Sequence, residues 1–259
     1  MDLGISGRTA IVCAASKGLG RACALQLARE GVNVVISART KADLEATAQE
    51  IRNAANVKVE AVACDVTTEE GRAAILKACP APDILINNAG GPPPGDFKDF
   101  SLDDWRKAVE WNMITPIALI KSTVYGMMDR RFGRILNITS QSVKAPIASL
   151  ELSNGARAGL TGAIAVMARR AVRHNVTINN ILPGPFETDR LKSSTKRMAE
   201  LQGKSVDEVA AKRKAEVPAG RFGQPDEFGA AAAFMCSAQA GFITGQNLLL
   251  DGGIFPGSL

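Results

Sequence analysis

A glycine-rich turn between a short apolar run and an amphipathic segment constrains this chain most. Thr9–Cys13 is an apolar run of strand length, and Gly18–Glu30 has the apolar period of a helix that ends at Gly31. Between them the sequence reads Cys13-Ala-Ala-Ser-Lys-Gly-Leu-Gly20. Small residues allow the backbone to approach a pyrophosphate, and the N-terminus of the following helix favours its negative charge. The turn therefore predicts a dinucleotide site in the first strand-turn-helix unit.

Strand-length apolar runs and helix-length amphipathic segments alternate along the rest of the chain. This alternation predicts βαβ units with right-handed crossovers, and hence a parallel sheet covered by helices on both faces. We expect a single α/β domain over residues 1–259, a doubly wound Rossmann-type sheet of about seven strands. The expected strands are Thr9–Cys13, Val32–Ser37, Val57–Ala63, Ile84–Ile86, Arg134–Ile138, Val176–Leu182 and Asn247–Leu250, and the expected helices are Gly18–Glu30, Lys41–Arg52, Thr68–Cys79, Leu102–Arg130, Leu152–Arg173 and Asp226–Ser237.

The segment from residue 188 to residue 216 departs from this alternation. It is polar, rich in Lys, Arg and Glu, and follows the sixth expected strand. An insertion beyond the carboxyl ends of the strands is where an open α/β sheet builds a substrate lid. The basic residues of this lid are compatible with an anionic substrate, although they are also typical of a solvated helix.

Composition limits the other classes of function. The net charge of +5 is scattered, and aromatic residues make up only 5% of the chain, which favours an enzyme for phosphorylated ligands over a nucleic-acid-binding protein. No apolar run reaches membrane-spanning length and no signal-peptide pattern is present, so we expect no membrane association and a cytoplasmic location.

The five cysteines lie in apolar stretches without a CxxC spacing, which predicts buried, reduced thiols. The single histidine, His174, argues against a His-based metal site or a Ser-His-Asp triad, so we expect no metal.

The end of the second expected strand indicates which dinucleotide is bound. It carries no acidic residue for the 2′-hydroxyl of NAD, and Arg39 is placed to pair with the 2′-phosphate of NADP. Lys17 in the glycine-rich turn is a second candidate cation. Ala14 occupies the first of the three glycine positions expected in the turn, and we expect its φ to be negative because a left-handed alanine costs ~1–2 kcal/mol.

Over essentially its whole length the chain resembles the short-chain dehydrogenase/reductase family. The glycine-rich turn resembles the family's TGxxxGxG motif with Cys13 and Ala14 substituted, and Asn87-Asn-Ala-Gly90 matches its NNAG motif. The region Gly220–Glu227 and the segment Asp251-Gly-Gly253 resemble the 3-oxoacyl-carrier-protein reductase branch. The resemblance implies a set of cofactor-binding residues: Ala14, Ser16, Lys17, Gly18, Leu19, Gly20, Arg39, Asp65, Val66, Asn88, Ala89, Gly90, Arg157, Pro183, Gly184 and Thr188.

The resemblance also locates the catalytic positions, and there the sequence departs from the family. Asn112 matches the structural and proton-relay Asn, and Ser140 matches the Ser that polarises the carbonyl. Alignment of Arg157-Ala-Gly-Leu160 with the family's K-A-x-L places Arg157 at the Lys and Ser153 at the Tyr of the YxxxK motif. The chain's only tyrosine, Tyr125, lies elsewhere in the pattern. A hydroxyl is a much weaker acid than a phenol, and Arg, unlike Lys, cannot shuttle a proton.

Three functions are compatible with these substitutions. The first is an atypical oxidoreductase that transfers hydride between NADP(H) and a small molecule with a C=O, C=N or C=C bond over Ser140. The second is an NADP(H)-binding sensor or partner subunit without turnover. The third is non-redox chemistry in a reused pocket. The family resemblance further implies a homo-oligomer, either a tetramer or a dimer.

Overall fold

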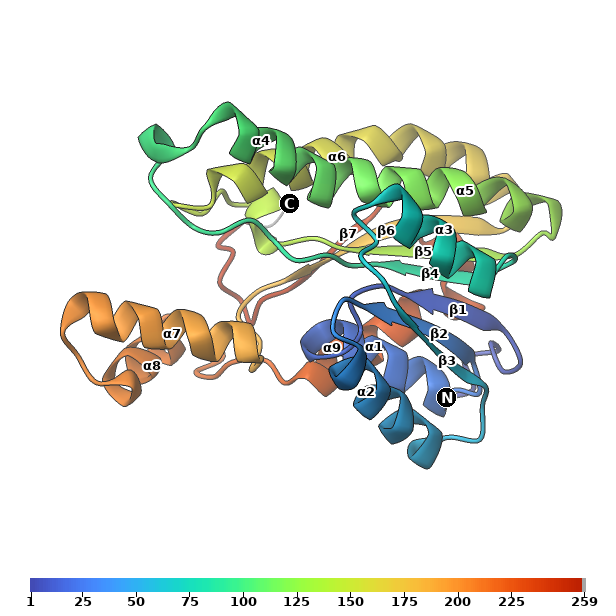
Figure 1. The fold of residues 1–259 in the computed structure, drawn as a ribbon, viewed down its shortest axis with the longest axis horizontal. Coiled ribbons are helices and arrows are strands. Elements are labelled where there is room, and N and C mark those ends of the chain that lie inside the picture. Colours follow the sequence, from blue (N-terminus) through green and yellow to red (C-terminus); the bar gives the residue numbers. More distant parts are fainter. Residues whose placement is uncertain (258–259) are drawn as a thin grey trace.

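The computed structural model describes residues 1–257, which form one α/β domain around a parallel sheet of seven strands (Figure 1). The strand order is β3-β2-β1-β4-β5-β6-β7, and every neighbouring pair is parallel. The single-domain Rossmann-type fold expected from the sequence is confirmed. The strands are β1 (Thr9–Val12), β2 (Asn33–Ala38), β3 (Val59–Ala63), β4 (Ile84–Asn87), β5 (Gly133–Ile138), β6 (Val176–Pro183) and β7 (Asn247–Leu250).

Helices cover both faces of the sheet (Figure 1). Alternate side chains of a strand point to opposite faces, so Ala10 and Val12 of β1 join one apolar core and Ile11 joins the other. The first core is shared with α1 (Gly18–Arg29), α2 (Lys41–Ala54) and α9 (Pro225–Met235). The opposite face carries α3 (Glu69–Ala78), α4 (Leu102–Val109), α5 (Thr115–Asp129) and α6 (Glu151–Ala171).

The strand order reverses between β1 and β4, which places a crevice at the carboxyl ends of these central strands. Ligands of open α/β sheets bind at this kind of switch point. The turns that follow β1, β4, β5 and β6 carry the glycine-rich turn, the NNAG segment, Ser140 and Gly184, respectively. The topology thus brings most of the candidate site residues to one edge of the sheet.

The expected long helix from Leu102 to Arg130 consists of two α-helices joined by a π-helical turn. A π-helical turn, Glu110–Ile114, separates α4 from α5 and carries Asn112. π-helical turns inside α-helices frequently occur at functional sites. The apolar period of this segment does not distinguish a π turn from an α-helical turn, so the sequence predicted an uninterrupted helix.

The polar segment 188–216 forms two helices, α7 (Asp189–Gln202) and α8 (Val206–Ala215), which project from the body of the domain beside the carboxyl ends of the strands (Figure 1). Thr188 caps α7, since its Oγ1 accepts a hydrogen bond from the backbone N–H of Leu191. Gly203, with a φ of +62°, ends α7. Nη1 of Arg213 in α8 donates a 3.0 Å hydrogen bond to Oγ of Ser194 in α7, and the helical pair is therefore cross-linked. No helix within residues 1–257 combines the length and the hydropathy of a membrane span.

Ala14 differs from the expectation for the glycine-rich turn. Its φ is +48°, in the left-handed region, where the expected value was negative. The conformation is imposed by neighbours on both sides: the backbone N–H of Ala15 donates to Ser37 O, and Nδ2 of Asn88 donates to Ala14 O. The chain thus holds an alanine in a conformation that favours glycine, at a cost of about 1 kcal/mol.

Replacement of Ala14 by glycine should therefore stabilise the protein. We expect the free energy of unfolding to increase by about 1 kcal/mol, measured by urea denaturation. Ala15, which is buried and has no positive φ, is the matched control, and Ala15→Gly should decrease stability by a similar amount. Equal destabilisation by both substitutions would contradict the strain assigned to Ala14.

Candidate active site

The glycine-rich turn packs too closely for a side chain at its last glycine. A Cβ atom on Gly20 would lie 2.4 Å from Ala14 O and 2.9 Å from Nδ2 of Asn88. Ser16 O accepts a 2.8 Å hydrogen bond from Oγ1 of Thr47, which ties the turn to α2. Leu19 packs on the apolar core, and Gly18 has a φ of +58°. The result is a bare backbone cradle at the N-terminus of α1, which suits the pyrophosphate of a dinucleotide.

Two cations lie near the end of β2. Arg39 is exposed and directly follows the strand, and it has no ion pair within the described part of the chain. Lys17, expected as a second free cation, is instead paired with Asp43, with 2.9 Å between Nζ and Oδ2. The Lys17 and Asp43 side chains are 58% and 39% exposed, so the pair contributes little stability and leaves Arg39 as the available cation.

Asp65 and Val66 follow β3, where the resemblance expects contact with adenine. Oδ1 of Asp65 accepts hydrogen bonds from the backbone N–H of Thr67 (3.0 Å) and from its Oγ1 (2.7 Å). Val66 is buried, and Gly71 of α3 lies against the backbone of Asp65, where a Cβ atom would be 1.9 Å from its carbonyl oxygen. These contacts orient the carboxylate and leave Oδ2 available for a ligand.

A row of asparagines crosses four strands beside this cleft. Asn87 is in register with Asn137, which is in register with Asn180 and then with Asn247. Each Nδ2 donates to the next Oδ1, at 2.8, 3.0 and 2.7 Å. Oδ1 of Asn87 ends the row without a hydrogen-bond partner. This row fixes the strand ends from which the NNAG segment and Ser140 emerge.

Asn112 connects the π-helical turn with the NNAG segment. It is 4% exposed, and its Nδ2 lies 3.5 Å from the carbonyl oxygens of Gly90 and Ala108. Ala89 and Asn88 line the same cavity as Asn112. Asn112 therefore lies next to the NNAG segment.

Ser140, Ser153 and Arg157 lie at the end of β5 and on the first turns of α6. Oγ of Ser140 accepts a 3.1 Å hydrogen bond from the backbone N–H of Ser142. Oγ of Ser153 accepts a 3.1 Å hydrogen bond from Nε of Arg157, and Nη1 of Arg157 donates to Ile138 O at 2.9 Å. Within residues 1–257 neither serine hydroxyl donates to a protein acceptor, so both protons are available to a ligand.

Arg157 is a buried cation without a carboxylate partner in the described residues. Its side chain is 8% exposed, and burial, with a further contribution from the charge of Arg190, lowers its pKa to about 10. The guanidinium remains charged at neutral pH. A cation of this kind is poised to interact with a negative charge that a ligand brings or develops.

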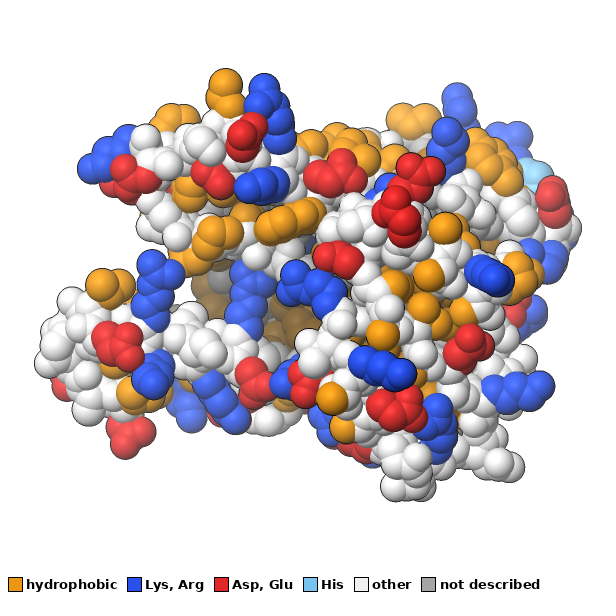
Figure 2. Space-filling model, viewed as in Figure 1, with side chains coloured by type: hydrophobic (Ala, Val, Ile, Leu, Met, Phe, Trp, Pro, Cys, Tyr) orange, Lys and Arg blue, Asp and Glu red, His pale blue; other side chains and the backbone are white. Residues whose placement is uncertain are grey.

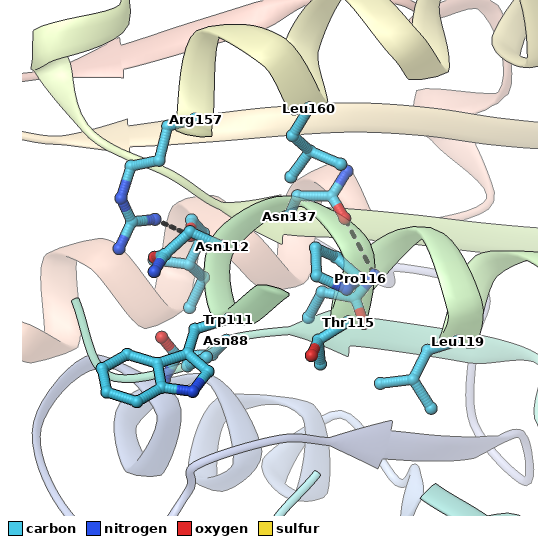
Figure 3. Close-up of a pocket in the computed structure, with 12 residues that line it drawn as sticks. Asn88, Trp111, Asn112, Thr115, Pro116, Leu119, Asn137, Arg157 and Leu160 are labelled. Atoms are coloured by element: carbon cyan, nitrogen blue, oxygen red, sulfur yellow. Dashed lines mark hydrogen bonds between the residues drawn. The ribbon is translucent and has the colours of Figure 1, made fainter. Parts of the chain in front are cut away.

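Figure 3 shows a small pocket that Arg157 and Asn112 both line, with the Arg157 side chain beside Asn112. Two further lining residues, Trp111 and Thr115, were not singled out by sequence reasoning. Oγ1 of Thr115 is buried and has no hydrogen-bond partner. Both residues lie on or beside the π-helical turn, and the geometry of that turn, invisible in the sequence, aims them at the cavity.

The segment after β6 completes the edge of the site. Pro183 ends the strand, and the backbone N–H of Gly184 donates to Leu250 O at 2.8 Å. Thr188 lies against Gly18, since a Cβ atom on Gly18 would be 3.5 Å from its methyl carbon. The glycine-rich turn and the N-terminus of α7 therefore meet across the cleft.

Tyr125, the only tyrosine of the chain, lies on α5 with 59% of its side chain exposed. It is not among the residues that line the cavity. His174 ends a short 3₁₀ segment after α6, away from the site. Four of the five cysteines are buried free thiols as expected, whereas Cys64 is only half-buried.

Comparison with known proteins places this arrangement in a family. The family model described as enoyl-(acyl carrier protein) reductase matches residues 13–254. The 3-oxoacyl-[acyl-carrier-protein] reductase of Vibrio cholerae is 34% identical over 257 residues, which cover 98% of this chain and 99% of the relative. The chain belongs to the short-chain dehydrogenase/reductase family.

Other members of this oxidoreductase family extend the comparison. The NADPH-dependent reductase BacG of Bacillus subtilis is 31% identical over 254 residues, which cover 96% of this chain and 98% of the relative. The solved structure of L-sorbose reductase from Gluconobacter frateurii, complexed with NADPH and L-sorbose, is 28% identical with a TM-score of 0.94, covering 99% of this chain and 100% of that one. The bare cradle at Gly20 leaves space for the phosphates of a dinucleotide.

Proposed function

We propose that this protein is an NADPH-dependent reductase of a small molecule with a polarised C=O, C=N or C=C bond. NADPH would lie along the carboxyl edge of the sheet, with its pyrophosphate on the Gly18–Gly20 turn and its 2′-phosphate on Arg39. Asp65, Asn88, Gly184 and Thr188 would hold the adenine and nicotinamide ends. The similarity to NADPH-dependent reductases such as BacG and YwfH supports this choice of cofactor.

One observation carries the proposal. Ser140 and Ser153 each accept a hydrogen bond and donate none to an acceptor within residues 1–257, so each hydroxyl can donate its proton to a ligand. Two hydroxyl donors beside a buried cation form a site for a substrate oxygen that gains negative charge. NADPH, when bound, would supply a hydride, to the carbonyl carbon of a ketone or to the β-carbon of a conjugated enone.

The catalytic positions that the family resemblance implies for Ser140, Ser153 and Arg157 suggest a role for each residue. Ser140 and Ser153 stabilise the oxyanion, or the enolate when the accepting bond is a conjugated C=C. Arg157 donates a hydrogen bond from Nε to Oγ of Ser153 and so orients that hydroxyl. It also adds a positive charge, since its pKa remains well above neutral pH. Neither the serine hydroxyls nor the Arg157 guanidinium release a proton readily at neutral pH. The proton that completes the product therefore comes from solvent.

An NADPH-oxidation assay against ketones, cyclic imines and enones tests the proposal. We expect turnover with at least one class, and Ser153→Ala should lower kcat/KM about 10²–10³-fold by removal of one oxyanion donor. Ser122→Ala, an exposed serine on α5, is the matched control. Saturable NADPH binding without turnover in all three classes would favour the sensor or partner-subunit function instead.

A further inference from the structure

Within residues 1–257, two arginines without acidic partners lie near the segment that follows the NNAG motif. Arg157 lies beside Asn112, whose Nδ2 is 3.5 Å from Gly90 O, and Arg190 lies against Gly91. Arg157 donates from Nε to Ser153 and from Nη1 to Ile138 O, whereas its Nη2 has no acceptor within residues 1–257, and the side chain lines the pocket. Arg190, in the first turn of α7, reaches across to the segment after NNAG. A Cβ atom on Gly91 would lie 2.8 Å from its Nη2 and 3.0 Å from its Nη1.

The acidic residues nearest to Arg190 in sequence are directed elsewhere. Glu187 lies 3.6 Å from Nζ of Lys214. The hydrogen bond to Asp43 raises the pKa of Lys17, and the charge of Asp189 makes a smaller contribution to the same shift. No ion pair includes Arg157 or Arg190 within residues 1–257, whereas the hairpin cation Lys204 pairs with Glu208. The two guanidinium groups also interact unfavourably, since the charge of Arg190 contributes to the lowered pKa of Arg157.

Such an arrangement is costly unless a ligand compensates it. A buried guanidinium without a counter-charge loses its hydration, and a second cation nearby adds repulsion. A carboxylate suits this pair, since its two oxygens accept charge-assisted hydrogen bonds from planar guanidinium groups. Figure 2 shows Lys and Arg side chains around the hollow between the α7–α8 hairpin and the α4 region, which would also attract an anion.

We infer that the substrate carries a carboxylate, bound between Arg157 and Arg190. This inference rests on the proposed reductase function and narrows its substrate to an organic acid. Because Arg190 belongs to the α7–α8 hairpin, the same contact holds that hairpin against the Gly91 loop while substrate is bound. The cradle proposed for the cofactor diphosphate, at the N-terminus of α1, lies against Thr188, whereas the guanidinium of Arg190 lies against Gly91.

The test uses acetate and acetamide, an anionic and a neutral probe of nearly equal shape. Each is titrated at constant ionic strength into protein with and without saturating NADPH, and Trp fluorescence reports binding because Trp111 lines the cavity with Arg157. We expect acetate to bind saturably, at least tenfold more tightly than acetamide. Arg190→Gln should weaken acetate binding about tenfold and leave the dissociation constant of NADPH within about twofold.

Arg197 is an exposed cation on the same helix, and Arg197→Gln is the matched control. It should change neither the dissociation constant of acetate nor that of NADPH. Equal binding of acetate and acetamide, or no saturation by acetate, would overturn the carboxylate site. A parallel loss of NADPH affinity in Arg190→Gln would assign Arg190 to the cofactor diphosphate and would overturn it as well. Failure of the unsubstituted protein to bind NADPH would count against the proposed reductase, whereas the acetate titration without NADPH would still decide on the anion site.

Discussion

Replacement of Arg157 by methionine is expected to stabilise the protein while it abolishes most of its activity. At neutral pH the charge of Arg157 costs the folded state about 3 kcal/mol, because burial lowers its pKa from 12.5 to about 10. This cost is complete below the folded-state pKa and disappears as the pH rises from about 10 toward 12.5. Loss of the hydrogen bonds to Ser153 and Ile138 offsets part of the gain, so we expect a net increase of about 1–2 kcal/mol in the free energy of unfolding.

The same substitution removes the positive charge from the oxyanion site. We expect kcat/KM to fall about 100-fold or more with the substrate class identified by the NADPH-oxidation assay. Thermal unfolding at pH 7 and steady-state kinetics measure the two effects separately. An opposite change in stability and activity is typical of a residue retained for function at the expense of stability.

Arg134 provides the matched control, because it is also a buried arginine but has all its partners within the protein. Its guanidinium donates to Ser237 O (2.8 Å), Gly133 O (2.8 Å), Asn175 O (2.9 Å) and Asn175 Oδ1 (3.2 Å). We expect Arg134→Met to destabilise the protein by about 3–5 kcal/mol, since buried acceptors lose their donors. Destabilisation of similar size by Arg157→Met would show that Arg157 is a structural residue and would contradict its place in the site.

Replacement of Arg39 by aspartate is expected to reverse the cofactor preference. Arg39 follows β2, exposed and without an ion pair within the described residues, and two charge-assisted hydrogen bonds to a 2′-phosphate would be lost. We expect NADPH to bind about 100-fold more weakly, because the introduced carboxylate also repels the phosphate. NADH binding should improve, since aspartate at this position can accept hydrogen bonds from the ribose hydroxyls.

Nicotinamide fluorescence titrations with NADPH and NADH measure the ratio of the two dissociation constants. Lys58→Asp, which makes the same change of charge at an exposed site before β3, should leave the ratio within about twofold, because exposed charges at a distance are screened by salt. A preference of the unsubstituted protein for NADH, or an unchanged ratio in Arg39→Asp, would contradict the assignment of Arg39 to the 2′-phosphate.

The sequence predicted the sheet and the positions of most candidate residues because both depend on local patterns. Apolar runs such as Ile84–Ile86 define buried strands, and a parallel topology then brings the following turns to one edge. The features that it did not predict depend on tertiary contacts. The positive φ of Ala14 is imposed by Ser37 and Asn88, residues distant in sequence.

The candidate site also combines features that local sequence patterns predict with features that depend on tertiary contacts. Arg157 could be aligned with a family position, but its unpaired charge is visible only once burial and the absence of a nearby carboxylate are known. Arg190 resembled any other cation of the polar segment until its guanidinium was placed over Gly91. The expected pairing of Lys17 with phosphate was likewise uncertain from sequence, since Asp43 lies on a separate helix. Charge complementarity between elements has no local signature.

The fate of the hydride tests the central claim most directly. The protein is incubated with NADPH deuterated at C4 of the nicotinamide, in separate 4R and 4S forms, together with the substrate class that supports turnover, and the product is analysed by mass spectrometry. A hydride-transferring reductase places deuterium in the product from one of the two forms. For a C=C substrate, a reaction in D2O with unlabelled NADPH should in addition place deuterium on the neighbouring carbon. Conversion of substrate without deuterium from either form of NADPH would contradict the account.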